Sequence, residues 1–412
     1  MSTHDFAFCC MIPKADNDWH GSSPKQGEHA AEREHETVTD GVNETQIPIF
    51  DGHNDTLLSL INTGRDYYQR SEIGHIDDVR AREGGLVGGF FACFVPSAEG
   101  QAWSTDVTTL LGSGLKGVPL ENEWGGPSQA YAQQFTNAMV ARLLNLEVGG
   151  GVMLHDLGSE DPPAMSDDPL TIIHFAEDLE ENIEAGNFSA ILHFEGAEMI
   201  DENFYALEAY HAAGLRSLGL VWSRSNQFGH GVPFLAESPD AGPGLTDAGK
   251  ELVMACNALG IMVDVSHLNE KGFWDVAGTT SAPIVATHSN AHALCRTSRN
   301  LTDKQLDAIR ESNGVAGVNF NVPFLHPENA RDVEMPLTVM ADHVDYLVDK
   351  LGIDGVALGS DFDGALMPND LSDCSKLPNL VALLRERGYD DDALLKIGYR
   401  NWVRLLCETW GM

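Results

Sequence analysis

Short apolar runs alternate with amphipathic stretches along most of the chain, beginning at Ile47. The apolar runs, which are rich in Val, Ile, Phe and Gly, are residues 47–50, 86–95, 190–194, 217–222, 261–266, 283–288, 314–320 and 355–360. Near-continuous apolar strands separated by helices indicate parallel βαβ units in a sheet covered on both faces. Eight such units predict an α/β fold of the TIM-type (β/α)8 barrel.

Four stretches carry a helical pattern. Residues 169–186 are amphipathic and end at Gly186, and residues 301–314 open with a capping box from Thr302 to Gln305 and close at Gly314. The stretches 338–352 and 391–410 are predicted to be strong helices as well.

The rest of the chain suggests a tail and an insertion. Residues 1–46 are polar and show no apolar periodicity after Ile12, so they are predicted to be a flexible N-terminal tail before a barrel domain at 47–412. Residues 97–128 are rich in Gly and Ser and are too long for an ordinary connection. We expect them to form an inserted loop or a lid over the active face.

Composition narrows the class of protein. The chain has 62 acidic and 25 basic residues and a net charge of −37, which argues against binding to nucleic acid or anionic membranes. This charge fits either adaptation to high salt or a strongly solvated surface. The seven cysteines show no C-x-x-C spacing, and there is no run of about 18 apolar residues. The N-terminus makes a poor secretion signal, so a cytoplasmic location is expected.

Polar residues follow several predicted strands at the point where each strand ends. In DGHND, His53 and Asp55 lie two positions apart and would project from one face of a strand. The simpler interpretation of this pair alone is a His–Asp hydrogen bond in a loop. Further candidates at strand ends are Glu195, His267, His288, Asp361 and Asp363. A TIM barrel carries its chemistry at these ends, which favours a site.

This set of residues suits two divalent ions. A histidine–aspartate pair, two histidines and one shared glutamate can hold two ions about 3.5–4 Å apart, with Glu195 as the natural bridge. Metals lower the pKa of a shared water and so supply a nucleophile at neutral pH, while an aspartate free of the metals can move the proton.

The motifs DGHND, HFEGAE, VDVSH, ATHSNAHALCRTSRN, GVNF and GSDFDG occur in this order. In order and spacing the chain resembles, over 47–412, the membrane (renal) dipeptidase family, zinc peptidases of the amidohydrolase-like barrel type. The resemblance implies that His53 and Asp55 bind one zinc, that His267 and His288 bind the other, and that Glu195 bridges them. It also implies that Arg299 binds the substrate carboxylate and that Asp361 is the catalytic aspartate.

Two positions depart from the mammalian pattern. Trp222 stands where mammalian members have a histidine thought to contact the substrate oxygen, and Asn321 stands where they have a tyrosine. Both affect oxyanion stabilisation and pocket shape. Asn226 and His230, in the loop after Trp222, are candidates to replace the missing histidine. The chain ends CETWGM without a hydrophobic tail, so we expect no lipid anchor of the mammalian kind.

Other polar residues have simpler interpretations. His193 is expected inside the barrel, His292 as a structural hydrogen-bonding residue, and His343 on the surface of a helix. Asp363 is expected to orient the site rather than react, and the acidic residues of 177–182 to form a solvated helix face.

These observations predict a soluble dinuclear zinc dipeptidase, in which a metal-bridging hydroxide attacks the scissile carbonyl and Asp361 moves the proton to the leaving amine. Arg299 would anchor the substrate's C-terminus in a bidentate pair. Two alternatives stay open: a related metal amidohydrolase acting on N-acyl amino acids or other small amides, and a non-catalytic ligand-binding barrel. A homo-oligomer such as a dimer is compatible with the sequence.

Overall fold

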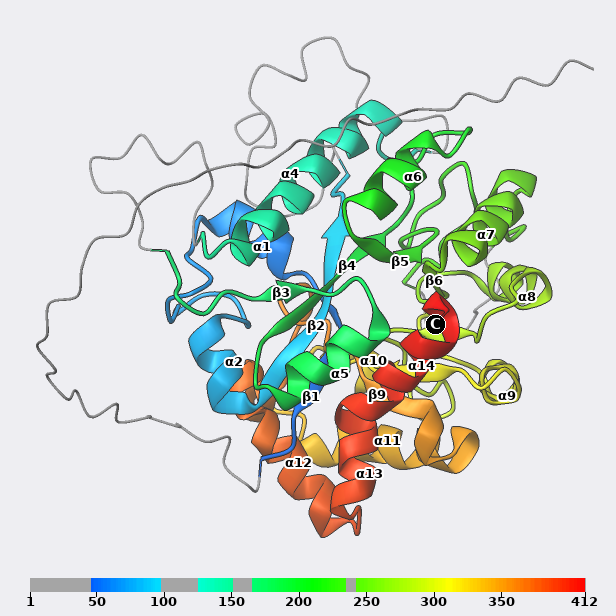
Figure 1. Ribbon diagram of the computed structural model, residues 1–412. Helices are drawn as coiled ribbons and strands as arrows, with labels where there is room; N and C mark the ends of the chain where they lie inside the picture. Colours follow the sequence, from blue (N-terminus) through cyan, green and yellow to red (C-terminus); the bar gives the residue numbers. More distant parts are fainter. Residues whose placement is uncertain (1–45, 98–124, 151–164, 235–241, 412) are drawn as a thin grey trace, which may run out of the picture. The chain divides into compact units, whose positions relative to one another are not determined.

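A computed structural model describes residues 46–97, 125–150, 165–234 and 242–411, and these lie in one compact unit. Eight strands follow one another in the order β1-β2-β4-β5-β6-β7-β8-β9, and every neighbouring pair is parallel (Figure 1). The first and last strands meet through a parallel bridge between Asn54 and Phe362. The predicted TIM-type (β/α)8 barrel is therefore confirmed.

All eight predicted strands are present, with shifted ends. Their bounds are β1 Ile49–Asn54, β2 Leu86–Phe94, β4 Ser189–Glu195, β5 Leu215–Gly219, β6 Met262–Asp264, β7 Val285–Ala286, β8 Val315–Val318 and β9 Val356–Leu358. A ninth short strand, β3 (Thr171–Ile172), pairs with β4 outside this series.

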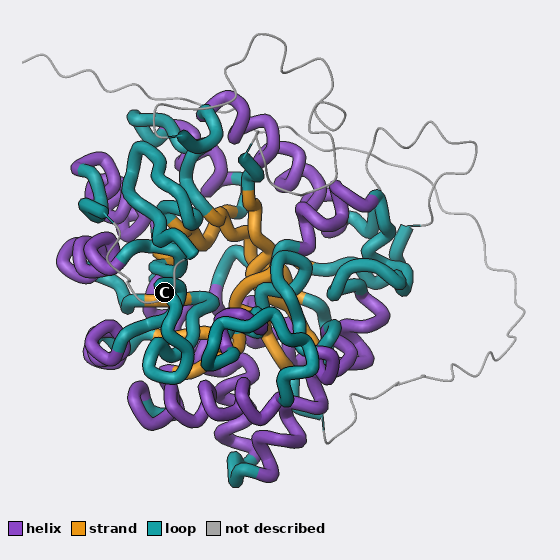
Figure 2. Tube along the Cα trace, turned by 180° about the vertical axis from the view of Figure 1, so that it is seen from behind, coloured by secondary structure: helices purple, strands orange, loops and turns teal. Residues whose placement is uncertain are grey.

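Helices surround the strands in the described part of the chain, as Figure 2 shows from behind. Their bounds are α1 Thr56–Thr63, α2 Asp78–Gly84, α4 Gln129–Glu147, α5 Ala176–Glu184, α6 Tyr205–Ala212, α7 Asp247–Leu259, α8 Glu270–Thr279, α9 Asp303–Glu311, α10 Val322–Leu325, α11 Leu337–Leu351, α12 Leu377–Glu386, α13 Asp391–Leu395 and α14 Asn401–Trp410. Short 3-10 turns lie at Ile353–Gly355, Asn369–Leu371 and Cys374–Lys376. None of the described helices is long and apolar enough to cross a bilayer.

Alternation along the strands separates two hydrophobic clusters. On β4, Ala190, Leu192 and Phe194 belong to the cluster that packs against the surrounding helices, whereas Ile191 belongs to a second cluster. That second cluster takes residues from seven strands and from α5 and α14; Trp402 is its largest member. Because side chains at i and i+2 share a face, His193 and Glu195 follow Ile191 on the inner face of the barrel.

One helix prediction needs correction. Residues 169–186 are not one helix, because Thr171–Ile172 pairs with β4 and the helix starts only at Ala176. Residues 391–410 are helical throughout as predicted, with a π-helical turn at Lys396–Arg400 between α13 and α14. The capping box at Thr302 is present: its backbone N–H donates to Gln305 Oε1 at 2.9 Å.

The predicted tail at 1–46 lies outside the described residues except for Gln46. The inserted loop or lid predicted at 97–128 is described only at its ends, Ser97 and 125–128.

Candidate active site

His53 and Asp55 lie where β1 passes into α1. Asp55 is the N-cap residue of α1, yet its side chain caps no backbone N–H. Both ring nitrogens of His53 and the Oδ1 atom of Asp55 are buried without a hydrogen-bond partner among the described residues. Buried polar atoms are costly to leave unpaired, so these three atoms need a partner of another kind. The loop His–Asp hydrogen bond is not formed, since His53 Nε2 and Asp55 Oδ2 are 3.8 Å apart.

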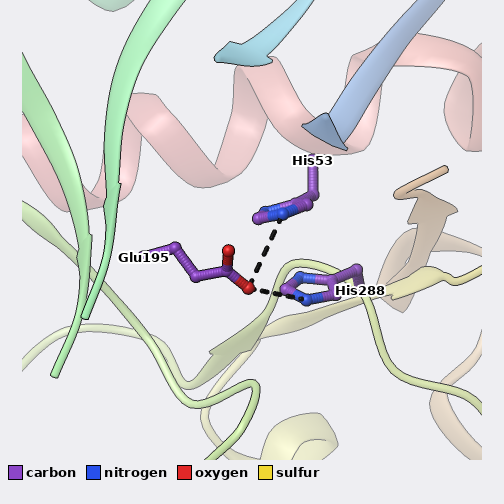
Figure 3. Close-up of side chains that lie close together, drawn as sticks. All are labelled: His53, Glu195 and His288. Carbon is purple, nitrogen blue, oxygen red and sulfur yellow. Dashed lines mark ion pairs between the residues drawn. The ribbon is translucent and has the colours of Figure 1, made fainter. Parts of the chain in front are cut away.

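Glu195, the last residue of β4, is the centre of the cluster. Its Oε1 atom lies 2.9 Å from His267 Nε2, 3.7 Å from His288 Nε2 and 3.8 Å from His53 Nε2. Figure 3 shows the rings of His53 and His288 turned toward this carboxylate. Imidazole nitrogens from three different strand ends thus converge on one carboxylate oxygen.

A hydrogen-bond chain fixes the ring of His288. Thr287 Oγ1 lies 2.6 Å from Asp264 Oδ2 and 2.8 Å from His288 Nδ1. A carboxylate only accepts, so the hydroxyl proton of Thr287 points to Asp264, and His288 Nδ1–H must donate to Thr287. The Nε2 lone pair of His288 is therefore left facing Glu195, which is the form that binds a metal.

His267 is held in a similar way. Its Nδ1 atom lies 2.8 Å from Ser223 Oγ, and its Nε2 atom lies 3.0 Å from His288 Nε2. The backbone of His267 has a φ of 70°, in the left-handed region that non-glycine residues seldom adopt. Such strain often accompanies a functional position, because the surrounding structure must hold the residue there.

Charge in the cluster is balanced by His53. Burial alone would lower the pKa of His53, but the facing carboxylates of Glu195 and Asp55 raise it to about 10. Burial raises the pKa of Glu195 to about 8. Burial and the nearby positive charges of Arg299 and His53 lower the pKa of His267 and His288 well below the usual range, so both are neutral. A divalent cation would supply the positive charge that a proton on His53 otherwise provides.

Asp361 lies beside the His53–Asp55 pair at the junction of the last strand and the first. One carboxylate oxygen of Asp361 lies within 4.8 Å of ligand atoms of His53 and Asp55. Its backbone N–H donates to His53 O at 2.9 Å, and Asn319 Nδ2 donates to its Oδ2 at 2.9 Å. Burial raises the pKa of Asp361 to about 6, near the pH at which a group can both accept and release a proton.

Asp363 differs from Asp361 because its oxygens are already occupied. Arg65 Nη2 at 2.9 Å, Thr56 Oγ1 at 3.0 Å and the backbone N–H of His75 at 2.6 Å all donate to it. These bonds hold the loop after β9 against α1 and the segment after it, which agrees with an orienting role.

A cavity of about 310 Å³ opens beside the cluster. Asp55, Glu195, His267 and Asp361 line its base. The residues of its aromatic wall are Phe94, Trp222, Phe234 and Phe324. The Trp222 ring lies 5.1 Å from Phe94 and 5.4 Å from Phe234 between centroids, so it belongs to this wall.

Asn321 also lines the cavity, and its Oδ1 accepts from the backbone N–H of Leu366. Arg299 does not belong to the described lining residues. Its guanidinium is buried, with Nη2 lying 3.1 Å from His267 Nε2 and Nη1 donating to Ser289 Oγ at 3.2 Å. The guanidinium also lies over the ring of Phe324, a lining residue, 5.5 Å from its centre.

Three of the remaining histidine predictions can be compared with the structure. His193 is inside the barrel as predicted, with Nδ1 2.8 Å from Ser217 Oγ. His343 was predicted on the surface and is fully buried: its Nδ1 accepts from the backbone N–H of Ala291. His292 was predicted to be a structural hydrogen-bonding residue: its backbone N–H donates to Leu301 O at 2.9 Å, whereas its side-chain Nε2 is buried without a partner among the described residues.

The two candidates to replace the missing histidine have other partners. Asn226 is buried, donating to Leu220 O and accepting from the backbone N–H of Phe228. His230 Nδ1 lies 2.8 Å from Ser225 Oγ. Neither lines the described cavity. The acidic residues of 177–182 are exposed on α5 as predicted.

Sequence reasoning missed the residues that hold the site in place. Asp264, Thr287 and Ser223 orient the two histidines, and the Arg224–Glu198 ion pair, 2.8 Å long, braces the wall. The Arg224 guanidinium lies 5.2 Å from the Phe94 ring centre and 5.4 Å from that of Trp222. The sequence did contain one sign of such a residue: Asp264 is a charged residue within the apolar run 261–266.

The donor set fits divalent metal ions. Unpaired buried imidazole and carboxylate atoms meet at strand ends, two neutral histidines present Nε2 atoms, and the carboxylates carry the charge that a cation offsets. A (β/α)8 barrel with this site belongs to the class of metal-dependent hydrolases.

The chain belongs to the membrane dipeptidase family, peptidase family M19, whose family model matches residues 42–410. It is thus a metallo-dipeptidase by family.

Similar proteins include an uncharacterized protein in the pqqA 5′ region of Klebsiella pneumoniae, 50% identical over 236 residues (57% of this chain, 87% of the relative). A protein in the PQQ-III 3′ region of Acinetobacter calcoaceticus is 35% identical over 311 residues (74% and 90%). Among solved structures, the chain is similar to a metallo peptidase from Rhodobacter sphaeroides, with 42% sequence identity and a TM-score of 0.77. The match covers 89% of this chain and all of the other, which is liganded with a phosphinate mimic of the dipeptide L-Ala-D-Ala.

Proposed function

We propose that the chain is a dinuclear zinc dipeptidase that hydrolyses the peptide bond of small dipeptides. The observation that carries the proposal is the convergence of three imidazole nitrogens on Glu195 Oε1, at 2.9–3.8 Å, beside Asp55, whose Oδ1 atom has no hydrogen-bond partner among the described residues. His53 and Asp55 would hold one zinc, His267 and His288 the other, and Glu195 would bridge them. Ions held there would supply a water-derived nucleophile at neutral pH and would polarise the scissile carbonyl.

The protein's own groups provide binding and proton transfer. Asp361, with its pKa raised to about 6 by burial, takes a proton at neutral pH and passes it to the leaving amine. Asn319 holds the Asp361 carboxylate in place for this step. Arg299 anchors the substrate's free carboxylate, and Trp222 and Asn321 shape the cavity around the peptide.

The phosphinate mimic of L-Ala-D-Ala bound by the Rhodobacter sphaeroides metallo peptidase supports a dipeptide as the class of substrate. An aromatic wall would also accept an acyl chain, so a metal amidohydrolase acting on N-acyl amino acids is the second candidate. The family assignment sets the non-catalytic barrel aside. The cytoplasmic location and a homodimer stay predictions from the sequence.

The test combines metal analysis with turnover. Purified protein should carry about two zinc equivalents per chain, and a chelator should abolish hydrolysis of L-Ala-L-Ala and L-Ala-D-Ala. Glu195→Gln should lose metal from both positions, since the bridge serves both. Activity on dipeptides that persists in metal-free protein would refute the proposal, and hydrolysis of N-acetyl amino acids alone would favour the second candidate.

A further inference from the structure

The charges around the cavity are distributed unevenly. Its base carries three carboxylates, Asp55, Glu195 and Asp361, and its wall is aromatic. Arg331, an exposed residue in the segment after α10, also lines the cavity. Among the described lining residues it is the only arginine or lysine.

Arg331 makes no hydrogen bond or ion pair with any residue that the structure describes. Of the two other arginines near the cavity, Arg224 is paired with Glu198, and Arg299, the proposed α-carboxylate clamp, contacts Ser289 and His267. The chain has 62 acidic and 25 basic residues, so carboxylates that could pair with an arginine are plentiful. Arg331 nevertheless pairs with none of those that the structure describes. A substrate carboxylate would not have to displace a described partner in order to reach it.

We infer that Arg331 selects dipeptides whose C-terminal residue carries an acidic side chain. This inference rests on the proposed function, in which Arg299 holds the α-carboxylate of that residue. The Arg299 guanidinium lies 5.5 Å from the ring centre of Phe324, and Phe324 lines the cavity together with Arg331. Phe324 and Arg331 both lie in the segment after β8. Phe324 thus links the proposed α-carboxylate clamp to the cavity that Arg331 lines, and this link is the basis for assigning the C-terminal residue of the substrate to Arg331.

The expected preference is moderate. A guanidinium and a carboxylate can pair through two parallel hydrogen bonds. Arg331 is exposed, however, and exposed pairs are weak. We expect kcat/KM to be about three- to tenfold higher for an acidic side chain than for its neutral amide.

The experiment compares L-Ala-L-Glu with the near-isosteric L-Ala-L-Gln, and L-Ala-D-Glu with L-Ala-D-Gln, at fixed ionic strength. The quantity measured is the ratio of the two kcat/KM values, so a general loss of activity in a variant cancels. Arg331→Met should bring the ratio close to one. Arg331→Glu should reverse it and should favour L-Ala-L-Lys over L-Ala-L-Gln.

Arg296→Glu is the matched control. Arg296 is exposed, makes no hydrogen bond or ion pair with a described residue and does not line the cavity. Arg296→Glu changes the net charge by the same amount as Arg331→Glu but leaves the cavity unchanged. It should keep the wild-type ratio. The pair L-Glu-L-Ala and L-Gln-L-Ala checks the position, and it should show little preference.

The outcomes separate the two ideas. Hydrolysis of dipeptides with equal rates for Glu and Gln, a ratio unchanged in Arg331→Glu, or a preference confined to the N-terminal residue overturns the role of Arg331 and leaves the dipeptidase proposal standing. An equal shift of the ratio in Arg296→Glu assigns the effect to net charge and also overturns it. No hydrolysis of any dipeptide overturns both.

Discussion

The hydroxyl of Thr287 is a small group on which metal binding should depend strongly. Replacing Thr287 with Val keeps the shape of the side chain and removes two contacts, the bond to Asp264 Oδ2 at 2.6 Å and the contact with His288 Nδ1 at 2.8 Å. All three residues are buried, so water cannot take the place of the lost partner. The His288 ring would then lose the bond that fixes its tautomer.

The magnitude follows from these contacts. A hydrogen bond to a charged group is worth about 1.5–3 kcal/mol, and a neutral one about 1 kcal/mol, so the free energy of unfolding of the metal-free protein should fall by roughly 2–4 kcal/mol. Residues that orient a metal-binding histidine typically change metal affinity about 10- to 100-fold. We expect a loss of this size for one of two zinc equivalents, the one held by His288.

The assay is a zinc titration of metal-free protein against a chromophoric chelator, with urea unfolding in parallel. Thr136→Val is the matched control, because Thr136 is fully buried in α4 and its hydroxyl has no partner among the described residues. The same chemical change there should leave both zinc affinities unaltered and should not reduce stability. Equal zinc affinities in Thr287→Val and wild type would show that the hydroxyl does not orient His288.

Further predictions concern catalysis, pH and salt. Arg299→Ala should mainly raise KM for dipeptides, and wild type should cleave dipeptide C-terminal amides poorly; amides cleaved as well as free dipeptides would exclude a carboxylate clamp. Asp361→Asn should lower kcat by orders of magnitude while metal content by elemental analysis stays near wild type, and a near-normal kcat would reduce Asp361 to a brace. Burial lowers the pKa of His343 to about 4, so the unfolded chain binds a proton that the folded chain excludes between pH 6.5 and about 4. Stability from this group is present above pH 6.5 and falls by about 1.4 kcal/mol per pH unit below it, and His343→Gln should flatten that part of the profile in urea unfolding; an unchanged slope contradicts this. The melting temperature should rise with sodium chloride because salt screens the repulsion of a net charge of −37 over about 10 Å at 0.1 M, and a flat curve would leave the charge as a solubility feature.

The barrel was predictable because its strands are local apolar runs, each readable without its neighbours. The error at 169–186 has the opposite origin. Thr171 and Ile172 form a strand because they pair with Ser189 and Ala190, which lie beyond α5 in the chain. The β-branched sequence Thr171–Ile173 favoured a strand, but the apolar spacing of the stretch as a whole suggested a helix.

The candidate metal ligands were found because a barrel places its chemistry at strand ends, where polar residues stand out. Asp264 and Thr287 were missed because neither is itself a candidate ligand. Asp264 contacts Thr287, and Thr287 in turn contacts the candidate ligand His288. His343 could have been placed correctly: it lies three residues after Met340 and four before Leu347, both buried, which puts it on the inner face of α11.

The closure of the barrel has a consequence for biosynthesis. Asp361 N–H bonds to His53 O, and Ser360 Oγ bonds to Asp51 Oδ2 across 309 positions of the sequence. On a ribosome, the chain carrying His53 and Asp55 emerges long before Asp361 has been made. The nascent chain therefore cannot assemble the proposed site until the ninth strand has been synthesised and has docked onto the first. A truncated translation product that ends before Asp361 would lack this site.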